Sequence, residues 1–358
     1  VPAPTSKVFF TCSGSEANDT QIKLVWDYNN ARGLTKKKKI ISRMKAYHGV
    51  TIAAGSLTGL PVFHADFDLP MQRVLHTDCP HYWRYAEEGE SEEEYATRLA
   101  NNLEDLIQRE GPETIAAFIA EPVMGAGGVI PPPRTYFQKI QEVLRRYDIM
   151  MIADEVICGF GRTGNWFGSQ TFGIDPDTIT MAKAITSAYM PLGAVTVSEP
   201  VYEALLEESK KLGVFAHGFT YTGHPVSCAV ALKTLEIYER IDIVRHVQSV
   251  APVFETRLRA LRDHPLVGET RGVGLIGGIE LVKNKSTKES FDVRQGVGPK
   301  VVKLAEEEGL ICRAVAGDTI ALAPPLIING AEINLMFDAL GRALDRAEEW
   351  VRKEGLRG

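Results

Sequence analysis

Two residues with complementary chemistry follow two short apolar segments of the chain. Lys183 comes directly after Thr178–Met181 and Ala182, and Asp154 ends the segment Met150–Asp154, 29 positions earlier. A lysine amine can form a Schiff base with an aldehyde, and an aspartate can keep a pyridine nitrogen protonated. Together, the two residues are the minimal apparatus of an enzyme that uses pyridoxal 5′-phosphate.

The apolar segments before Asp154 and Lys183 lead to an expectation about the charge state of each residue. An acid at the end of a buried strand is costly unless it is paired, and a pyridinium N–H would keep Asp154 ionised. The alternatives for Asp154 are a helix N-cap or a structural ion pair, for example with Arg162. Burial would lower the pKa of Lys183 and make it nucleophilic, whereas the alternative is an exposed lysine at a strand end.

A turn near the start of the chain could hold a phosphate group. Ser13, Gly14 and Ser15 lie between an expected strand and an expected helix. Gly14 permits a close approach of the backbone, the serines offer hydroxyl groups, and the first amides of a helix bind anions. The alternative is a simple serine N-cap without a ligand.

Three further residues follow expected strands and could contact the cofactor ring. Tyr47 could stack on the ring, although a half-buried tyrosine at a sheet edge is the alternative. Glu121 could face the ring or the substrate, or it could be a strand-end acid with a structural partner. Val156 lies two residues after Asp154, so the alternation of a strand would place it on the same side of the sheet.

Other motifs are excluded by their context. The segment Gly272–Gly277 fits G-x-G-x-x-G, but a strand pattern follows it where a dinucleotide site requires a helix. We therefore expect a glycine-rich bend between two strands. The eight histidines show no metal-ligand spacing, so no metal site is expected.

The composition bounds the class of protein. The 358 residues are 44% hydrophobic and 24% charged, which is ordinary for a two-domain globular chain. The net charge of −6 gives no support for nucleic-acid or anionic-membrane binding, and no apolar run is long enough to span a membrane. Five scattered cysteines predict free thiols in a reducing cytoplasm. The basic run Lys36–Lys39 is expected to be a solvated loop or the start of a helix.

The order of the expected elements indicates an α/β fold. Strands are expected at Val8–Thr11, Lys39–Ser42, Ala116–Ala120, Met150–Ala153, Thr178–Met181 and Ala194–Val197, and helices at Ala17–Asn30, Glu92–Arg109, Thr135–Arg146 and Glu199–Glu208. This alternation predicts a mostly parallel sheet with helices on both faces and a ligand at the carboxyl ends of its strands. We expect a large domain over residues 1–227 and a smaller α+β domain over 228–358. Because the chain opens at Val1 without a methionine, we also expect a preceding segment.

Taken together, these motifs resemble those of one family. The chain is similar to the class III pyridoxal-phosphate aminotransferases of fold type I, and within them to the ω-amino acid or amine:pyruvate branch. The resemblance covers essentially all 358 residues. It is carried by Ser13–Asn18, Ala46–Gly49, Ile152–Val156, Gly159–Gly164, Ala182–Lys183 and His217–Pro225.

The resemblance implies a fold, a cofactor and roles for individual residues. It implies a large domain with a seven-stranded, mostly parallel sheet and pyridoxal 5′-phosphate as the cofactor. Within that site, Lys183 would link to the cofactor and move the proton, and Asp154 would partner the pyridine nitrogen. The remaining positions implied are Ser13, Gly14 and Ser15 at the phosphate, Tyr47, Glu121 and Val156 around the ring, Thr220 at a neighbouring subunit's phosphate, and Arg313 at the acceptor carboxylate.

The implied reaction moves an amino group from an amine or ω-amino acid to an α-keto acid, most simply pyruvate, by a ping-pong mechanism in a homodimer or tetramer with shared sites. The alternatives are a 2-oxoglutarate-dependent aminotransferase, another fold-type-I enzyme such as an aminomutase, epimerase or decarboxylase, and a non-catalytic relative that only binds the cofactor. One departure from the family is Cys12, which stands where asparagine is common and could change the hydrogen bonds of the phosphate turn.

Overall fold

The computed structural model describes residues 5–357, which form two compact units. Of the described residues, the first unit comprises 5–123, Pro132–Phe160 and Asn165–Ile241, and the second comprises Met124–Pro131, Gly161–Gly164 and 242–357. The boundary expected between residues 227 and 228 lies within helix α8 (Pro225–Arg240), which belongs to the first unit. The segment expected ahead of Val1 lies outside the described residues.

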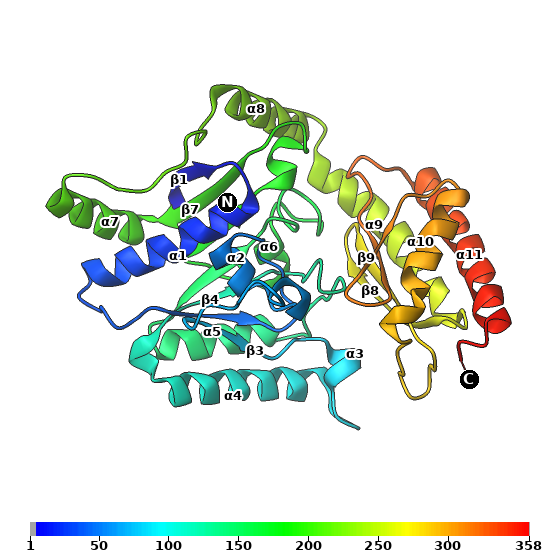
Figure 1. The fold of residues 1–358 in the computed structure, drawn as a ribbon. Helices are drawn as coiled ribbons and strands as arrows, with labels where there is room; N and C mark the ends of the chain where they lie inside the picture. Colours follow the sequence, from blue (N-terminus) through cyan, green and yellow to red (C-terminus); the bar gives the residue numbers. More distant parts are fainter. Residues whose placement is uncertain (1–4, 358) are drawn as a thin grey trace. The chain divides into compact units, whose positions relative to one another are not determined.

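The first unit is built on a seven-stranded sheet (Figure 1). Its strands are β1 (Thr5–Thr11), β2 (Lys39–Arg43), β3 (Val74–Thr77), β4 (Ile115–Ala120), β5 (Met150–Asp154), β6 (Thr178–Met181) and β7 (Gly193–Ser198). They lie in the order β1-β7-β6-β5-β4-β2-β3, and only β7 runs antiparallel to its neighbours. The predicted mostly parallel sheet is therefore confirmed.

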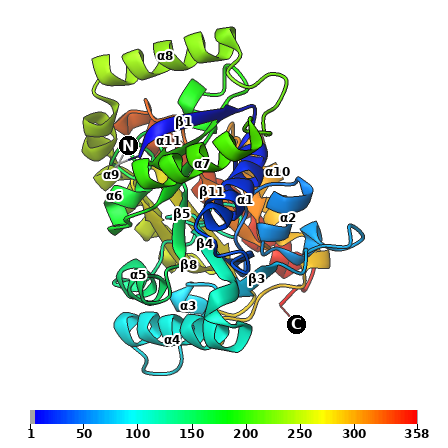
Figure 2. The same cartoon turned by 90° about the vertical axis from the view of Figure 1, so that its left-hand side faces the viewer.

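Helices cover both faces of this sheet, as the two views in Figures 1 and 2 show. The helices of the unit are α1 (Gly14–Ala31), α2 (Ile52–Leu57), α3 (Tyr82–Tyr85), α4 (Glu92–Glu110), α5 (Tyr136–Arg146), α6 (Gly168–Phe172), α7 (Glu199–Leu212) and α8, with short 3₁₀ turns η1 (Pro61–Phe63), η2 (Pro112–Thr114) and η3 (Lys183–Thr186). Within β4, Phe118 and Ala120 pack with α4 and α5, while Ala117 and Ile119 pack with α1 and α7. This period of two explains why the central strands are apolar throughout.

The lysine run is not the solvated loop that its charge predicts, because three of its members bind helix ends. Lys37 is 6% exposed and donates hydrogen bonds to two carbonyl oxygens just after α5. Lys38 donates to a carbonyl and an amide oxygen in the last two turns of α1. Lys39 donates to both the carbonyl and the carboxylate of Glu110, the last residue of α4. Cations at these positions complement the negative ends of three helix dipoles.

The second unit is a four-stranded antiparallel sheet with three helices, which confirms the expected small α+β part. Its elements are α9 (Ile243–Ala260), η4 (Leu261–Asp263), β8 (Val267–Val273), β9 (Ile276–Leu281), η5 (Val293–Gln295), α10 (Val297–Glu307), β10 (Arg313–Val315), β11 (Thr319–Leu322) and α11 (Gly330–Lys353). Gly272 pairs with Gly277 across the β8–β9 hairpin, and Gly274 in its turn has a φ of 59°. The exclusion of a dinucleotide motif is thus confirmed.

Every helix within residues 5–357 is too short or too polar to span a lipid bilayer.

Candidate active site

A cavity of about 380 Å³ lies within the first unit, at the carboxyl ends of the central parallel strands. This is the edge of an open α/β sheet at which ligands are expected to bind. Its volume falls within the usual range for small-molecule sites. Eight residues predicted from the sequence line it: Ser13, Gly14, Ser15, Tyr47, Glu121, Asp154, Val156 and Lys183.

The first turn of α1 forms one wall of the cavity. Ser13 is the N-cap, and its hydroxyl accepts a hydrogen bond from the Glu16 amide at 3.1 Å. The Ser15 hydroxyl accepts from the Val50 amide at 3.2 Å. A side chain at Gly14 would come within 3.1 Å of Val156, so glycine permits this close approach. The N-cap alternative and the phosphate hypothesis are compatible, because the start of this 18-residue helix lines the cavity.

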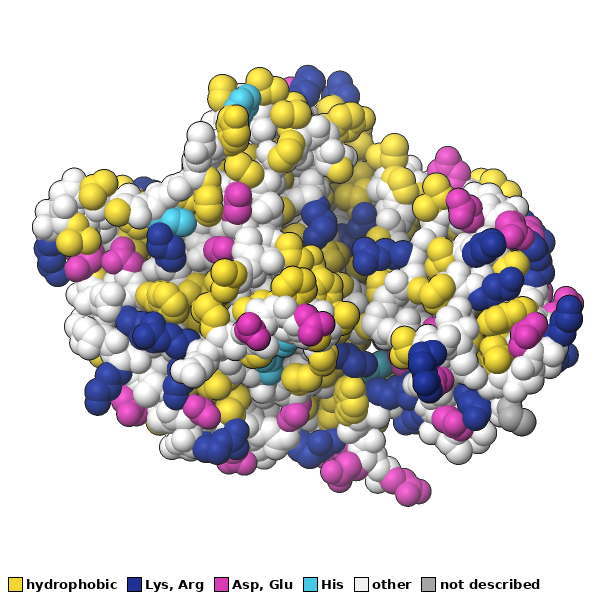
Figure 3. Space-filling view, viewed as in Figure 1, with side chains coloured by type: hydrophobic (Ala, Val, Ile, Leu, Met, Phe, Trp, Pro, Cys, Tyr) yellow, Lys and Arg dark blue, Asp and Glu magenta, His cyan; other side chains and the backbone are white. Residues whose placement is uncertain are grey.

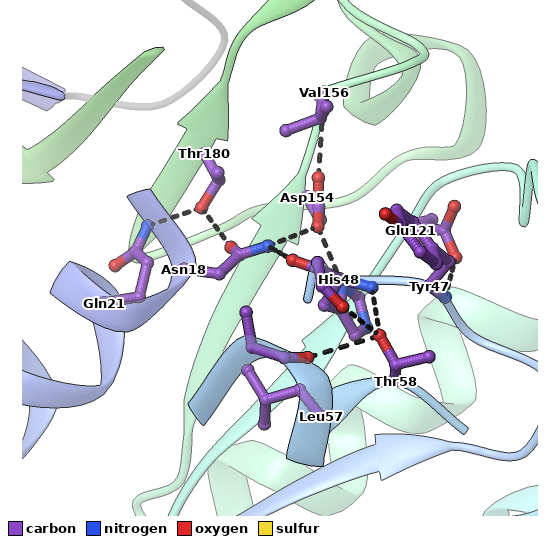
Figure 4. A network of polar contacts seen from close by, with 12 residues as sticks. Asn18, Gln21, Tyr47, His48, Leu57, Thr58, Glu121, Asp154, Val156 and Thr180 are labelled. Carbon is purple, nitrogen blue, oxygen red and sulfur yellow. Dashed lines mark hydrogen bonds and ion pairs between the residues drawn. The ribbon is translucent and has the colours of Figure 1, made fainter. Parts of the chain in front are cut away.

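Asp154 ends β5 with its carboxylate only 2% exposed (Figure 4). Its Oδ2 accepts hydrogen bonds from His48 Nδ1 at 2.7 Å and from Asn18 Nδ2 at 2.8 Å. Its Oδ1 accepts from the amide of Val156 at 3.1 Å. Arg162, the alternative partner, donates instead to two backbone carbonyls of the second unit. The three donors favour an ionised carboxylate at the cavity wall.

Lys183 is exposed, and the expectation of a buried lysine is therefore wrong. It begins η3 directly after β6 and lines the cavity. Its φ of 46° lies in the left-handed region, which is uncommon for a residue with a side chain. This conformation turns the chain away from the strand direction, so that the lysine faces the cavity and not the apolar core. Strained backbone of this kind is concentrated at functional sites.

Glu121 and Tyr47 are joined by a hydrogen bond at the neighbouring strand ends. The Tyr47 amide donates to Glu121 Oε1 at 3.0 Å, and the Glu121 side chain is nearly buried. The fully buried guanidinium of Arg43 donates to the Glu121 carbonyl at 2.6 Å. The half-buried Tyr47 ring makes an edge contact with Phe63, with 5.4 Å between ring centroids. Glu121 therefore orients the segment that presents the Tyr47 ring.

Glu155 is adjacent to Asp154 but lies in a different environment. It is fully buried and accepts hydrogen bonds from the Gly168 amide and from the Ser169 amide and hydroxyl at the start of α6. Burial raises the pKa of Glu155 to about 7, and the hydrogen bonds from Ser169 and Gly168 oppose this rise. Glu155 thus fixes the loop that follows Asp154 and is not among the residues that line the cavity.

Two predicted site residues lie elsewhere. Thr220 is exposed on the loop between α7 and α8 and does not line the cavity of its own chain. Arg313 is exposed at the start of β10 in the second unit, where its backbone pairs with Ala321. Both roles remain predictions.

The sequence interpretation missed two residues that hold Asp154. His48 and Asn18 are 2% and 0% exposed, although both stand inside motifs that the resemblance uses. A signal was present for Asn18, because it and Gln21 share the inward face of α1 with apolar residues. Polar side chains on a buried helix face require partners. No comparable local signal distinguishes His48 from an ordinary buried histidine.

Known proteins resemble this chain over almost its whole length. A family model described as aminotransferase class-III matches residues 1–344. Gamma aminobutyrate transaminase 1, mitochondrial, from Solanum lycopersicum is 57% identical over 348 residues, which are 97% of this chain and 67% of that protein. Probable gamma-aminobutyrate transaminase 3, mitochondrial, from Oryza sativa subsp. indica is 57% identical over 96% of this chain and 68% of that protein.

Solved structures show the same fold. A transaminase with L-alanine has a TM-score of 0.96 and 55% identity, covering 98% of this chain and 82% of that one. The ω-transaminase from Pseudomonas jessenii in complex with PMP has a TM-score of 0.96 and 52% identity, covering 98% of this chain and 77% of that one.

The residues at the cavity fit pyridoxal 5′-phosphate, the cofactor of this family. A helix start with two serines and a glycine suits a phosphate, and a buried carboxylate with a donor-poor Oδ1 suits a pyridinium nitrogen. The amine of Lys183 at the same cavity suits an aldehyde. With its fold, its cavity and the match over residues 1–344 in agreement, the chain belongs to the class III aminotransferases and uses pyridoxal 5′-phosphate.

Proposed function

We propose that this aminotransferase moves an amino group from an amine or ω-amino acid to an α-keto acid, with pyruvate as the preferred acceptor. The observation that carries the proposal is the presence of Lys183 and Asp154 on the walls of one cavity. The relatives named as gamma-aminobutyrate transaminases support an ω-amino acid donor. The similar transaminase solved with L-alanine, the product of pyruvate, supports the acceptor.

Each wall of the cavity would bind a different part of the cofactor. Ser13, Gly14 and Ser15 would hold the phosphate at the start of α1. The ring would lie between Tyr47 and Val156, with Asp154 Oδ1 keeping its nitrogen protonated. When bound, pyridoxal 5′-phosphate supplies an aldehyde that links to amines and a ring that accepts electrons.

Lys183 would carry out the proton transfers of the reaction. Its Nζ would hold the aldehyde until a donor amine replaces it, and would then act as a base at the carbon bearing that amine. The same nitrogen would later return a proton. Asp154 would keep the ring electron-poor throughout, because an ionised carboxylate stabilises the proton on the ring nitrogen.

The donor and the acceptor would use this one cavity in turn. The deaminated product would leave before the keto acid enters, so initial-rate plots should show parallel lines. Arg313 would bind the acceptor carboxylate through a bidentate pair and turn aside for an apolar amine. Its exposed position in the second unit supports such a mobile role.

We further propose a homodimer, or a tetramer built from such dimers, in which Thr220 reaches the partner's phosphate site. Apolar side chains gather over α8 at the top of Figure 3. Val226 and Leu232 on α8 are 52% and 70% exposed, and Tyr221 next to Thr220 is 68% exposed. An apolar surface of this kind supports a contact with a second copy. Mixing Thr220→Ala subunits with Lys183→Ala subunits should restore a fraction of the activity if the sites are shared.

A donor and acceptor screen tests the proposed reaction. We expect γ-aminobutyrate or another ω-amine with pyruvate to yield alanine at a stoichiometry of one per carbonyl product. Faster turnover with 2-oxoglutarate than with pyruvate would contradict the proposed acceptor. Isomerised or decarboxylated donor without alanine would contradict amino transfer itself.

A reducing compartment is supported by the five cysteines, all of which are free thiols. We propose the cytoplasm as the location. Because two similar relatives are named as mitochondrial, cell fractionation with an organelle marker is the deciding measurement.

A further inference from the structure

A chain of buried amides and hydroxyls reaches Asp154, and none of its members lines the cavity (Figure 4). Gln21 Nε2 donates to Thr180 Oγ1 at 3.1 Å, and Thr180 Oγ1 donates to Asn18 Oδ1 at 2.9 Å. Asn18 Nδ2 then donates to Asp154 Oδ2 at 2.8 Å. All three relay residues, Gln21, Thr180 and Asn18, are 0% exposed.

The order of donors fixes the orientation of every group in this relay. A hydroxyl has one proton, so Thr180, which accepts from Gln21, must direct that proton to Asn18 Oδ1. The Asn18 amide nitrogen therefore faces Asp154, and its second proton meets the carbonyl of His48 at 2.7 Å. Turning the Asn18 amide over would place its oxygen against two acceptors and its nitrogen against the proton of Thr180.

The position of Thr180 in the sheet makes the relay rigid. Thr180 is the direct neighbour of Asp154 across β5 and β6, and its carbonyl accepts from the Glu155 amide at 2.9 Å. Asn18 and Gln21 come from α1, whose first turn forms the proposed phosphate site. One hydrogen-bonded chain thus connects the helix of the phosphate turn to the carboxylate at the ring nitrogen.

We propose that Asn18, Thr180 and Gln21 are positioning residues that hold Asp154 Oδ2 inward and direct Oδ1 at the nitrogen of the cofactor ring. The inference rests on the proposed function, and none of the three residues lines the cavity. Without the relay, Asp154 Oδ2 keeps its His48 donor but loses the Asn18 donor or the fixed orientation of that donor, so the carboxylate is held less firmly. The proton on the ring nitrogen is then held less firmly, and the cofactor binds more weakly.

The strand β6 supplies a matched control. Thr178 lies two residues before Thr180, is also 0% exposed, and has a hydroxyl without a hydrogen-bond partner among the described residues. Thr178→Val and Thr180→Val make the same chemical change in the same buried strand, but only the second breaks the relay. Thr180→Ser keeps the hydroxyl and serves as the rescue.

The test uses the full-length holoenzyme and the same protein after removal of its cofactor. The first measurement is the Kd for pyridoxal 5′-phosphate. We expect it to rise about tenfold or more in Asn18→Leu, which loses a hydrogen bond to the charged Asp154, and about fivefold in Thr180→Val, which loses the neutral hydrogen bond that orients Asn18. Thr178→Val and Thr180→Ser should stay within about twofold of the parent, since both keep the relay.

The second measurement is the pH midpoint of the visible absorption band of the bound cofactor. A proton on the ring nitrogen repels a second proton on the nitrogen that joins Lys183 to the cofactor. The midpoint should therefore rise in Thr180→Val and Asn18→Leu but not in Thr178→Val. A merely structural loss would lower the melting temperature of both valine variants and leave the two midpoints equal.

Each outcome decides the proposal. Equal Kd and equal midpoint in the two valine variants would overturn the relay. If Thr180→Val does not fold, Gln21→Met takes its place, with the same signs and smaller changes expected, and values equal to the parent would overturn the inference. If the parent protein binds pyridoxal 5′-phosphate but the two valine variants are equal, only the relay fails. If the parent protein binds no pyridoxal 5′-phosphate, the proposed function fails together with the relay.

Discussion

Two charged side chains among residues 5–357, Arg271 and Asp154, have opposite surroundings. In the second unit, Arg271 is 7% exposed in its side chain and donates to the carboxylates of Glu269 and Glu280 and to the carbonyls of Gly128 and Val129. In the first unit, the Asp154 side chain is 2% exposed, but its Oδ1 has a single donor, at 3.1 Å, at the wall of a cavity.

The two side chains differ in how many of their polar atoms have partners within the protein. Protein groups on several sides neutralise the guanidinium of Arg271, so it serves to join strands β8 and β9 to the segment 128–129. For Asp154, Asn18 and His48 both donate to Oδ2, whereas Oδ1 accepts a single hydrogen bond, from the Val156 amide, at the cavity wall. A charge that stabilises a fold is enclosed, whereas a charge that does chemistry is oriented and accessible.

The largest effect is expected for Lys183→Ala. Removing the amine removes both the proposed covalent holder and the proposed base, so amino transfer should fall by at least about a thousandfold. Because the side chain is exposed, the melting temperature should change little. Lys36→Ala, another exposed lysine, is the control and should keep parental turnover. A Lys183→Ala variant with parental rates would remove this residue from the mechanism.

Asp154→Asn changes the charge of this side chain but not its shape. Asp154→Asn removes the negative charge and should lower kcat by about a hundredfold or more, because a preoriented charge at the ring nitrogen is lost. The folded protein should persist, since Asn18 and His48 can still meet an amide oxygen. Steady-state kinetics on both substrates measures the effect. A loss confined to stability would place Asp154 in the same class as Arg271.

The converse is expected for Arg271→Met. Two partly buried carboxylates lose the guanidinium that pairs with both of them, so the free energy of unfolding should fall by about 3 kcal/mol. Turnover per folded molecule should stay at the parental value. Denaturant titration followed by active-site counting separates the two quantities, and a lower kcat for correctly folded protein would contradict the comparison.

Glu155, the residue next to Asp154, is a second test of the comparison between enclosed acids and the acid at the cavity wall. Burial raises its pKa to about 7 in the folded protein from an ordinary value of 4.5, so between these pH values the folded state keeps a proton that the unfolded chain releases. Stability should therefore fall as the pH rises from about 4.5 to about 7, by about 3 kcal/mol in all. Glu155→Gln should remove this pH dependence in urea unfolding. A parental curve identical to that of the variant would show that Glu155 is ionised at all these pH values.

The smallest effect is expected for Arg313→Ala. Losing the proposed bidentate partner of the acceptor carboxylate should raise KM for pyruvate about tenfold, with little change for an amine that lacks a carboxylate. Arg313→Lys should recover only part of the affinity, because a lysine cannot form the paired hydrogen bonds. Equal loss for both substrates would contradict the role as an acceptor clamp.

Much of the fold follows from the sequence because the central strands are apolar runs bounded by turns. Strands β4, β5 and β6 and helices α1, α4 and α5 lie within a few residues of their predicted ranges. Strand β3 was missed, since Val74–Thr77 is a short edge strand with a histidine in it. The lysine run was misjudged because its partners are helix ends far away in the sequence, which charge alone cannot reveal.

Some features of the candidate site could also be predicted from the sequence, and others could not. Residues at strand ends, such as Asp154 and Glu121, could be predicted because the topology of a parallel sheet brings them to one edge. The orientation of each side chain depends on contacts across the fold, for example between Asn18 and Thr180, which are 162 positions apart. The left-handed turn at Lys183 likewise overrides the buried position that its apolar neighbours indicate.

The most direct test of the account is to locate the link between protein and cofactor. Reducing the holoenzyme with borohydride makes a carbon–nitrogen link permanent, and peptide mass spectrometry then identifies the modified residue. We expect the mass of reduced pyridoxal phosphate on the peptide that contains Lys183 and on no other lysine. Modification at another lysine, or none at any, would contradict the central claim.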